Sequence, residues 1–308
     1  MAGKTQNIDK PKAIKNSPGD QVVQIVIYIL VILICAVILL PCLNVLALSL
    51  NDGVDAARGG VWVWPRVFTL ENYAQVFKDG SIMRGYLITI GRTVIGTALS
   101  IVVTSLAAFG LKEKEMPGRA VISFLITFTM LFGGGTIPTY IQYNNLHLID
   151  NYLVYIIPSL VSVTYLMMMR NSIEAIPQSL NESAELDGCG YFRSFISITM
   201  PLCKPVIAVV CLYTAVNHWN DWFSGAFYMT SSEKWPVQTV LQQMLARAMA
   251  AQQEVTSVSQ AVAQASKNVT TDSLKMAAVV ITTLPILCVY PFVQKYFTKG
   301  ALIGAVKG

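Results

Sequence analysis

The stretch ESAELDGCGYFRSFISITMPLCKP, residues 182–205, decides how the rest of the chain is interpreted. It contains three acidic residues, two basic residues, a Gly-x-Gly and two prolines, and such residues are costly in hydrocarbon. Apolar sequence long enough to cross a bilayer lies on both sides of it. The stretch is therefore expected to leave the membrane and to meet something in water.

The composition of the whole chain is that of an integral membrane protein. Of its 308 residues, 54% are hydrophobic and only 13% are charged, whereas soluble domains carry about 25% charged residues. The net charge of +5 is interpreted as a topology signal. The sequence has no cluster of basic and aromatic residues of the kind that would predict nucleic-acid binding. The six cysteines form no C-x-x-C pair, so neither a disulfide nor a metal site is expected.

Six apolar segments are long enough to count as spans, since about 20 helical residues cross the hydrocarbon core. The fold class is therefore an all-α integral membrane protein with tails at residues 1–21 and 295–308. The predicted six-helix transmembrane domain covers residues 22–294, with a loop at 171–204 between the fourth and fifth spans. The predicted spans are 22–48, 86–111, 119–137, 152–169, 205–227 and 274–294.

Lysine and arginine residues orient this set of spans. With the N-terminus inside, the inner segments hold 13 of the 22 basic residues, the outer segments hold seven, and Arg92 and Lys275 lie within spans. The seven outer residues are also spread over two long loops, which count less in the positive-inside rule. Both termini and the stretch 182–205 are thus predicted to face the cytoplasm.

Two short helices are predicted around the stretch. Ser179 and Glu182 fit the S-x-x-E capping box, which would open a helix that ends at Gly188. A second helix would present one apolar face before Pro201 and Pro205 interrupt it; that face comprises Phe192, Phe195, Ile196 and Thr199. On the residues alone, Glu182 either caps an interfacial linker or meets a partner.

The long outer segments have different patterns. Residues 49–85 carry NDG, RGG and a Trp-Val-Trp-Pro run, which predict turns and short strands. Residues 241–253, LQQMLARAMAAQQ, are rich in helix-forming residues and predict a helix.

The pattern E-S-A-x-x-D-G, a spacer and P-L-x-x-P resembles the cytoplasmic EAA loop of permease subunits in ATP-driven, binding-protein-dependent importers. Ser183, where the family often has Ala, and Cys189 are small departures. NLHLIDNYLVYIIP, HWNDWFSGAF and the ending YPFVQKYFTKGALIGAVKG resemble the carbohydrate branch, especially its complex-oligosaccharide permeases. The matching residues of the loop are Glu182, Ala184, Asp187, Gly188, Pro201 and Pro205.

This resemblance implies a type I ABC importer permease in a bacterial cytoplasmic membrane. The expected partners are a homologous second permease, two cytoplasmic ATPase subunits and an extracytoplasmic sugar-binding protein. The EAA loop would form a coupling helix that docks on an ATPase and drives alternating access, and the tail would reach between the two ATPases. ATP and Mg²⁺ would be bound by these partners, because the chain lacks a Walker A loop and is not expected to be an enzyme.

The sugar pathway is predicted near the sequence HWNDWFSGAF, at Asn217, Trp219, Asn220 and Trp222, because aromatic faces and amides suit sugar rings. The competing interpretation is structural, since tryptophans gather at membrane interfaces and polar residues join helices. For the whole chain, the alternative function is an ion-coupled secondary transporter, although the acidic residues lie mostly in loops.

Overall fold

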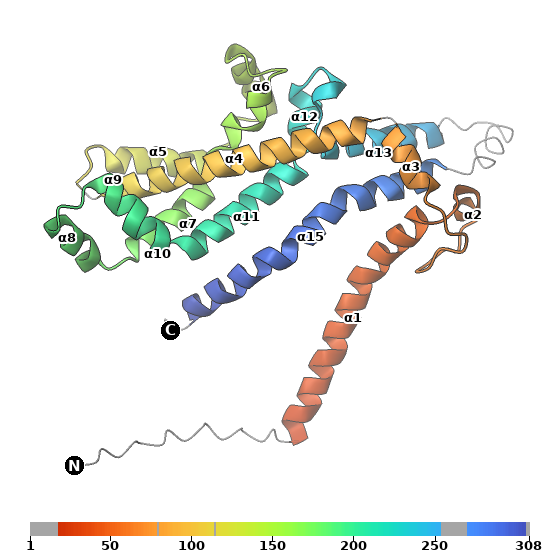
Figure 1. The fold of residues 1–308 in the computed structure, drawn as a ribbon, viewed down its shortest axis with the longest axis horizontal. Coiled ribbons are helices and arrows are strands. Elements are labelled where there is room, and N and C mark those ends of the chain that lie inside the picture. Colours follow the sequence, from red (N-terminus) through yellow and green to blue (C-terminus); the bar gives the residue numbers. More distant parts are fainter. Residues whose placement is uncertain (1–17, 79, 114, 254–269, 306–308) are drawn as a thin grey trace.

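The computed structural model describes residues 18–78, 80–113, 115–253 and 270–305, and these residues form helices joined by loops (Figure 1). One isolated antiparallel bridge, between Asn51 and Phe68, is the extended pairing within the described residues. The main helices are α1 (Pro18–Ser49), α4 (Ser81–Lys112), α5 (Arg119–Leu131), α6 (Thr136–Asn145), α7 (Val163–Glu174), α11 (Lys204–Asn220), α13 (Val237–Gln253) and α15 (Thr271–Ala305).

Three of these helices are long and apolar enough to cross a bilayer by themselves. They are α1, α4 and the part of α15 between Asp272 and Val289. Two bent helix pairs also qualify if each is taken as one span, which gives up to five candidates in the described part of the chain. The bent pairs are Tyr152–Ser159 with Val163–Glu174, and Tyr191–Leu202 with Lys204–Asn220.

Helix α4 is the centre of the bundle, and α7, α11 and α13 all pack against it. Figure 1 shows α4 and α11 running side by side, with α15 along the other side of α11. Small residues let helix backbones approach closely in a membrane. The buried face of α4 is rich in them, including Thr89, Gly96, Ser100, Thr104 and Ala108.

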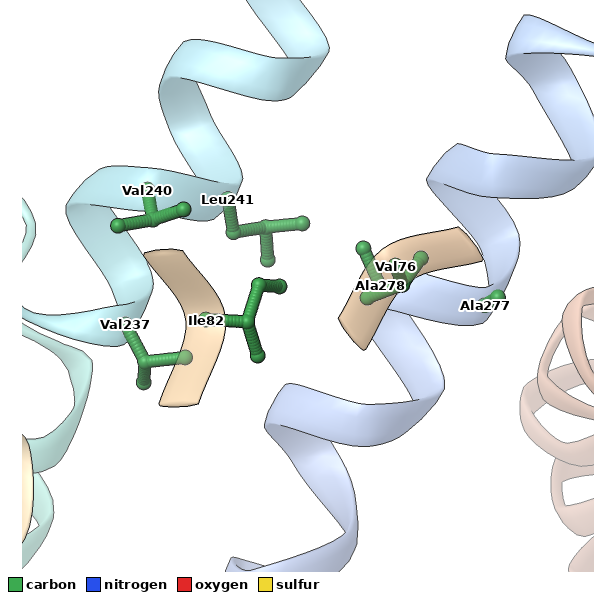
Figure 2. Close-up of a cluster of buried hydrophobic side chains, with 7 residues drawn as sticks. All are labelled: Val76, Ile82, Val237, Val240, Leu241, Ala277 and Ala278. Atoms are coloured by element: carbon green, nitrogen blue, oxygen red, sulfur yellow. The ribbon is translucent and has the colours of Figure 1, made fainter. Parts of the chain in front are cut away.

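Two apolar clusters hold the ends of this bundle. The cluster near α8 (Gln178–Leu186) joins α4 to α7 and α11 through residues such as Leu111, Met169 and Val210. The cluster at the opposite end of α4 brings α3 (Glu71–Lys78), α4, α13 and α15 together (Figure 2). Ile82 of α4 lies at the centre of this second cluster and is fully buried.

Helix α1 diverges from the bundle toward the N-terminus (Figure 1). It contacts α15, but its residues 22–40 are exposed in the isolated chain. Its mean hydropathy reaches 3.3, the highest of the candidate spans. Most of the apolar surface of α1 is therefore left uncovered by the rest of the described chain, as expected of a helix that lies in hydrocarbon.

The helix predicted at residues 241–253 is confirmed as the larger part of α13. The prediction for residues 49–85 was partly right: the RGG and Trp-Val-Trp-Pro runs contain a turn and bends, and Asn51 pairs with Phe68 in a bridge. The segment also contains two helices that were not predicted, α2 (Gly53–Ala57) and α3. The Asp52 side chain accepts hydrogen bonds from the backbone N–H groups of Val54 and Asp55 and so begins α2. All six cysteines are free.

Candidate functional site

The stretch 182–205 begins within a helix that lies beyond the end of the bundle. Helix α8 (Gln178–Leu186) follows α7 and lies at one extremity of the molecule (Figure 1). Glu182 is exposed on it, and its carboxylate has no hydrogen bond or ion pair within the described residues. Leu186 is 90% exposed, so α8 presents both an acidic and an apolar group to its surroundings.

The end of α8 is confirmed at Gly188. The N–H of Gly188 donates to the Glu185 carbonyl, and the N–H of Cys189 donates to the Ala184 carbonyl, which is the hydrogen-bond pattern of a Schellman motif. Gly188 has φ +77°, a conformation that glycine adopts without the Cβ penalty. No atom lies within 4 Å of a Cβ placed there, so the requirement for glycine is conformational.

The start of α8 differs from the prediction. The capping box was wrong: Pro177 is the N-cap residue, no side chain caps the helix, and Ser179 lies within the first turn. Proline has a fixed φ and no N–H group, so it begins the helix two residues earlier than a serine cap would. Glu182 is therefore released from the capping role that the pattern assigned to it.

A π-helical segment follows α8 and changes the predicted apolar face. The second helix begins as α9 (Tyr191–Ser194), continues as the π-helical η3 (Phe195–Thr199) and ends as α10 (Met200–Leu202). Phe195 and Thr199 are buried as predicted, but Phe192 and Ile196 are exposed. The i→i+5 hydrogen bonding of a π turn shifts the register, and the Phe195 ring packs 5.2 Å from Phe109 of α4.

The two prolines occupy the joint between this segment and α11. Residues Tyr191–Leu202 and Lys204–Asn220 meet at an angle of 81°. Pro201 lies at the start of α10 and Pro205 at the start of α11, the helix positions where a missing N–H is tolerated. Buried Cys203 lies at the corner, where the Ser172 hydroxyl of α7 donates toward its sulfur over 3.6 Å.

A group of charged residues braces the same end of the bundle. Glu174 at the end of α7 pairs with Arg170, at 2.9 Å, and with Arg119 of α5, at 3.3 Å. The Arg119 Nε also donates to the Leu111 carbonyl of α4. These contacts join the ends of α4, α5 and α7 directly before α8 begins.

A second site lies between α7 and α11. A cleft of about 340 Å³ separates α11 from the 3₁₀ segments η1 (Tyr152–Tyr155) and η2 (Ile157–Ser159) and from α7. The Asn217 amide donates to the Tyr165 hydroxyl across it, at 2.9 Å. Its polar lining includes Ser159, Ser162, Tyr165, Thr214, Asn217 and Asp221.

Of the four residues predicted for the sugar pathway, only Asn217 lines this cleft. The Trp219 indole N–H donates to the Thr282 carbonyl of α15, so Trp219 joins two helices. Asn220 is exposed, and Trp222 packs edge-on against Phe223 at the start of α12 (Phe223–Tyr228). Tyr165 and Thr214 were not predicted from the sequence, although Thr214 and Asn217 have the i, i+3 spacing of one helix face and Asp221 follows at i+7, at the end of α11.

An ion pair between Asp221, which lines the cleft, and buried Arg92 lies next to the cleft. Arg92 of α4 donates from Nη1 to the Asp221 carboxylate, at 3.2 Å, and from Nη2 to the Asp221 carbonyl. The Arg92 side chain is 2% exposed, that of Asp221 31%. The guanidinium also lies 5.1 Å from the centre of the Tyr155 ring. The other carboxylate oxygen of Asp221 accepts from the Ser224 N–H, so Asp221 joins α4, α11 and α12.

The contacts continue into the loops beyond the cleft. The Tyr155 hydroxyl donates to the Lys234 carbonyl, and the Lys234 ammonium lies 2.6 Å from the Asp150 carboxylate. This hydrogen bond holds the pKa of the Asp150 carboxyl below its usual range. Asp150 has φ +56°, a strained conformation that its several contacts maintain.

Comparisons with known proteins agree on one family. The family described as "Binding-protein-dependent transport system inner membrane component" matches residues 101–302. The chain is 35% identical over 289 residues to the polygalacturonan/rhamnogalacturonan transport system permease protein YtcP of Bacillus subtilis (strain 168), covering 94% of this chain and 99% of that protein. It is 25% identical to the arabinooligosaccharides transport system permease protein AraQ of the same organism, covering 96% and 100%.

A solved structure has the same fold. It is the crystal structure of a bacterial ABC transporter involved in the import of the acidic polysaccharide alginate. The match has a TM-score of 0.83 and 28% sequence identity, and it covers 92% of this chain and all of the matched chain.

Proposed function

Because the chain belongs to the family of binding-protein-dependent transport system inner membrane components, we propose that it imports a sugar or oligosaccharide as one of two homologous permease subunits. Members of this family are multi-pass membrane subunits of ABC importers, and ATP is bound by their partner ATPases. The family decides against the ion-coupled alternative. The names of the relatives, which refer to polygalacturonan, arabinooligosaccharides and alginate, support a saccharide as the substrate.

The proposed topology has six spans, with both termini in the cytoplasm. The sixth candidate is α5, whose 13 residues rise about 20 Å as a helix and are followed by the non-helical residues 132–135. The permease domain then covers 22–294, and residues 1–21 and 295–308 are cytoplasmic tails. The arginine residues that brace the end of the bundle near α8 support a cytoplasmic position for that end.

In this proposal α8 is the coupling helix that docks on a partner ATPase. The observation that carries it is the exposed position of α8 between two candidate spans, with a Glu182 that has no partner among the described residues. A basic group of the ATPase would pair with Glu182, while Ala184 and Asp187 lie on the same helix. Gly188 ends the helix tightly, and the prolines at 201 and 205 stiffen the joint to α11, so movement of the ATPase reaches the membrane.

The coupling role is tested by Glu182→Lys in the complete transporter. We expect the variant to assemble and insert, but stimulated ATP hydrolysis and sugar uptake to fall at least about tenfold, as a charge reversal opposes one charge-assisted contact. Glu71→Lys makes the same charge change on exposed α3, at the other end of the bundle, and should leave uptake unchanged. Uptake by Glu182→Lys that equals the control would remove Glu182 from the coupling mechanism.

The proposed partners are tested by purification from native membranes. One homologous permease, two ATPase copies and a sugar-binding protein should accompany this chain. A preparation that transports without ATPase subunits would contradict the proposal.

The sugar pathway is proposed along the end of α11, at Asn217, Trp219 and Asn220, and at Trp222 just before α12. The cleft beside Asn217 supports this position most directly, because it combines hydroxyl, amide and aromatic groups.

A further inference from the structure

The cleft between α7 and α11 contains a hydroxyl group that lacks a partner. Thr214 is 4% exposed, and its Oγ1 has no hydrogen bond within the described residues. Buried polar groups are nearly always paired, and an unpaired one is costly. Thr214 lines the cleft, but its hydroxyl lies just beneath the surface, so a ligand hydroxyl supplies the missing bond when the side chain turns toward it on ligand entry.

The polar groups around Thr214 suit a ligand rich in hydroxyls. Tyr165 already accepts a hydrogen bond from Asn217, so its own O–H is free to donate to a ligand. The side-chain amide oxygen of Asn217 on α11 and the carboxylate of Asp221 at the end of α11 are hydrogen-bond acceptors. The volume of about 340 Å³ lies at the lower end of the range for small-molecule sites.

The charge that a ligand meets in this cleft is negative. Asp221 lines the cleft, whereas Arg92 does not, and no lysine or arginine lies among the described lining residues. The Arg92 side chain is 2% exposed and the Asp221 side chain 31% exposed, so the cation is hidden behind its partner. An ionised sugar acid would approach the Asp221 carboxylate more closely than the Arg92 guanidinium behind it, so repulsion by the nearer charge exceeds attraction by the farther one in a medium of low dielectric.

We propose that this cleft is a binding site for one uncharged sugar unit and that it rejects uronic acid units. Thr214 and Tyr165 donate to sugar oxygens, and Asn217 and Asp221 accept hydroxyl protons. This inference rests on the proposed function as a sugar permease and narrows the class of its substrate. It separates this chain from the acidic saccharides in the names of two of its relatives.

The test uses the complete transporter in lipid nanodiscs without its binding protein. The probes are α-1,4-linked galactotriose and trigalacturonate, which differ only in the carboxylates at C6, and calorimetry or saturation-transfer NMR measures binding. Galactotriose should bind at least tenfold more tightly than trigalacturonate. Equal binding, tighter binding of trigalacturonate, or binding of neither probe would overturn the inference.

Two variants assign the result to this cleft. Thr214→Val keeps the shape of the side chain and should weaken galactotriose binding by about fivefold, the value of one hydrogen bond. Thr97→Val removes another buried, unpaired hydroxyl, on α4 outside the cleft, and should have no effect. Equal affinities of these two variants would place the sugar elsewhere.

A paired replacement tests the charge argument. Arg92→Gln with Asp221→Asn removes both charges together, so no unpaired cation remains buried. The two trisaccharides should then bind within about threefold of each other, since hydrogen bonds remain and repulsion does not. Retention of the full preference would refute the role of Asp221. Co-purification of the ATPase subunits, checked before each titration, tests the proposed function separately.

Discussion

The buried pair between Arg92 and Asp221 makes a quantitative prediction. Asp221→Ala removes the carboxylate and leaves a guanidinium whose side chain is 2% exposed. The backbone carbonyl of residue 221 and the Tyr155 ring remain, but neither neutralises the charge. Removing one partner of a buried pair costs about 3–5 kcal/mol. Replacing both partners, as in Arg92→Met with Asp221→Ala, should cost much less because no buried charge is left.

The measurement is the midpoint of thermal unfolding of the purified transporter, followed by size-exclusion chromatography after heating. For a chain of this size, a loss of about 4 kcal/mol lowers the midpoint by about 6 °C. The matched control is Glu233→Ala, which removes the ion-pair partner of Arg84; Arg84, like Arg92, lies on α4. That pair is 3.6 Å apart with side chains 55% and 73% exposed, and exposed pairs contribute about 0–1 kcal/mol.

The comparison of single and double variants is the decisive part. If Asp221→Ala lowers the midpoint no more than Glu233→Ala, the Arg92 charge is hydrated and the reasoning fails. If the double variant is as unstable as Asp221→Ala alone, the cost comes from lost packing rather than from an unpaired charge.

Three further outcomes are expected. Gly188→Val should lower stimulated ATP hydrolysis and cost about 1–2 kcal/mol more than Gly188→Asn, because asparagine tolerates the left-handed conformation; equal activities would contradict the turn. Gly96→Ala should destabilise the protein by about 1–3 kcal/mol, because a Cβ there meets the His218 ring of α11. Gly91→Ala, where a Cβ has open space, should stabilise it by about 0.5–1 kcal/mol. Equal midpoints of thermal unfolding for the two variants would contradict this packing argument. The hydrogen bond from Lys234 lowers the pKa of the Asp150 carboxyl. The contact should therefore stabilise the protein fully above the usual pKa range of aspartate, and this stabilisation should be lost as the pH falls through the lowered pKa of the folded state. An NMR titration that gives Asp150 a pKa at or above the usual aspartate value would refute this prediction.

The sequence predicted the parts of the fold that depend on local chemistry. The end of α8 followed from one glycine, and α13 followed from helix-forming residues. The start of α8 was missed because two signals competed, and the fixed φ of Pro177 prevailed over the serine. The apolar face at 191–199 was half right, because packing of Phe195 against α4 selects a π turn that sequence periodicity does not encode.

The two candidate sites differ in how far the sequence predicted them. The proposed coupling segment is contiguous, so its motif contained nearly all of the residues proposed for it. The cleft is assembled from segments that are distant in sequence, and Tyr165 and Thr214 give no signal without the packing of α7 on α11. Arg92 was recognised from the sequence as an intramembrane charge, but its pairing with Asp221 required the structure.

The separation of Arg92 and Asp221 along the chain sets an order of events during synthesis. The two residues are 129 positions apart, so translation at about 5–20 residues per second makes Asp221 roughly 6–26 s after Arg92. Helix α4 must therefore enter the bilayer before its counter-ion exists, with an arginine that costs about 2.5–3.5 kcal/mol at insertion. The apolar side chains of α4, with a mean hydropathy of 2.1, have to favour insertion without help from Asp221, and the ion pair can form only after α11 has been made.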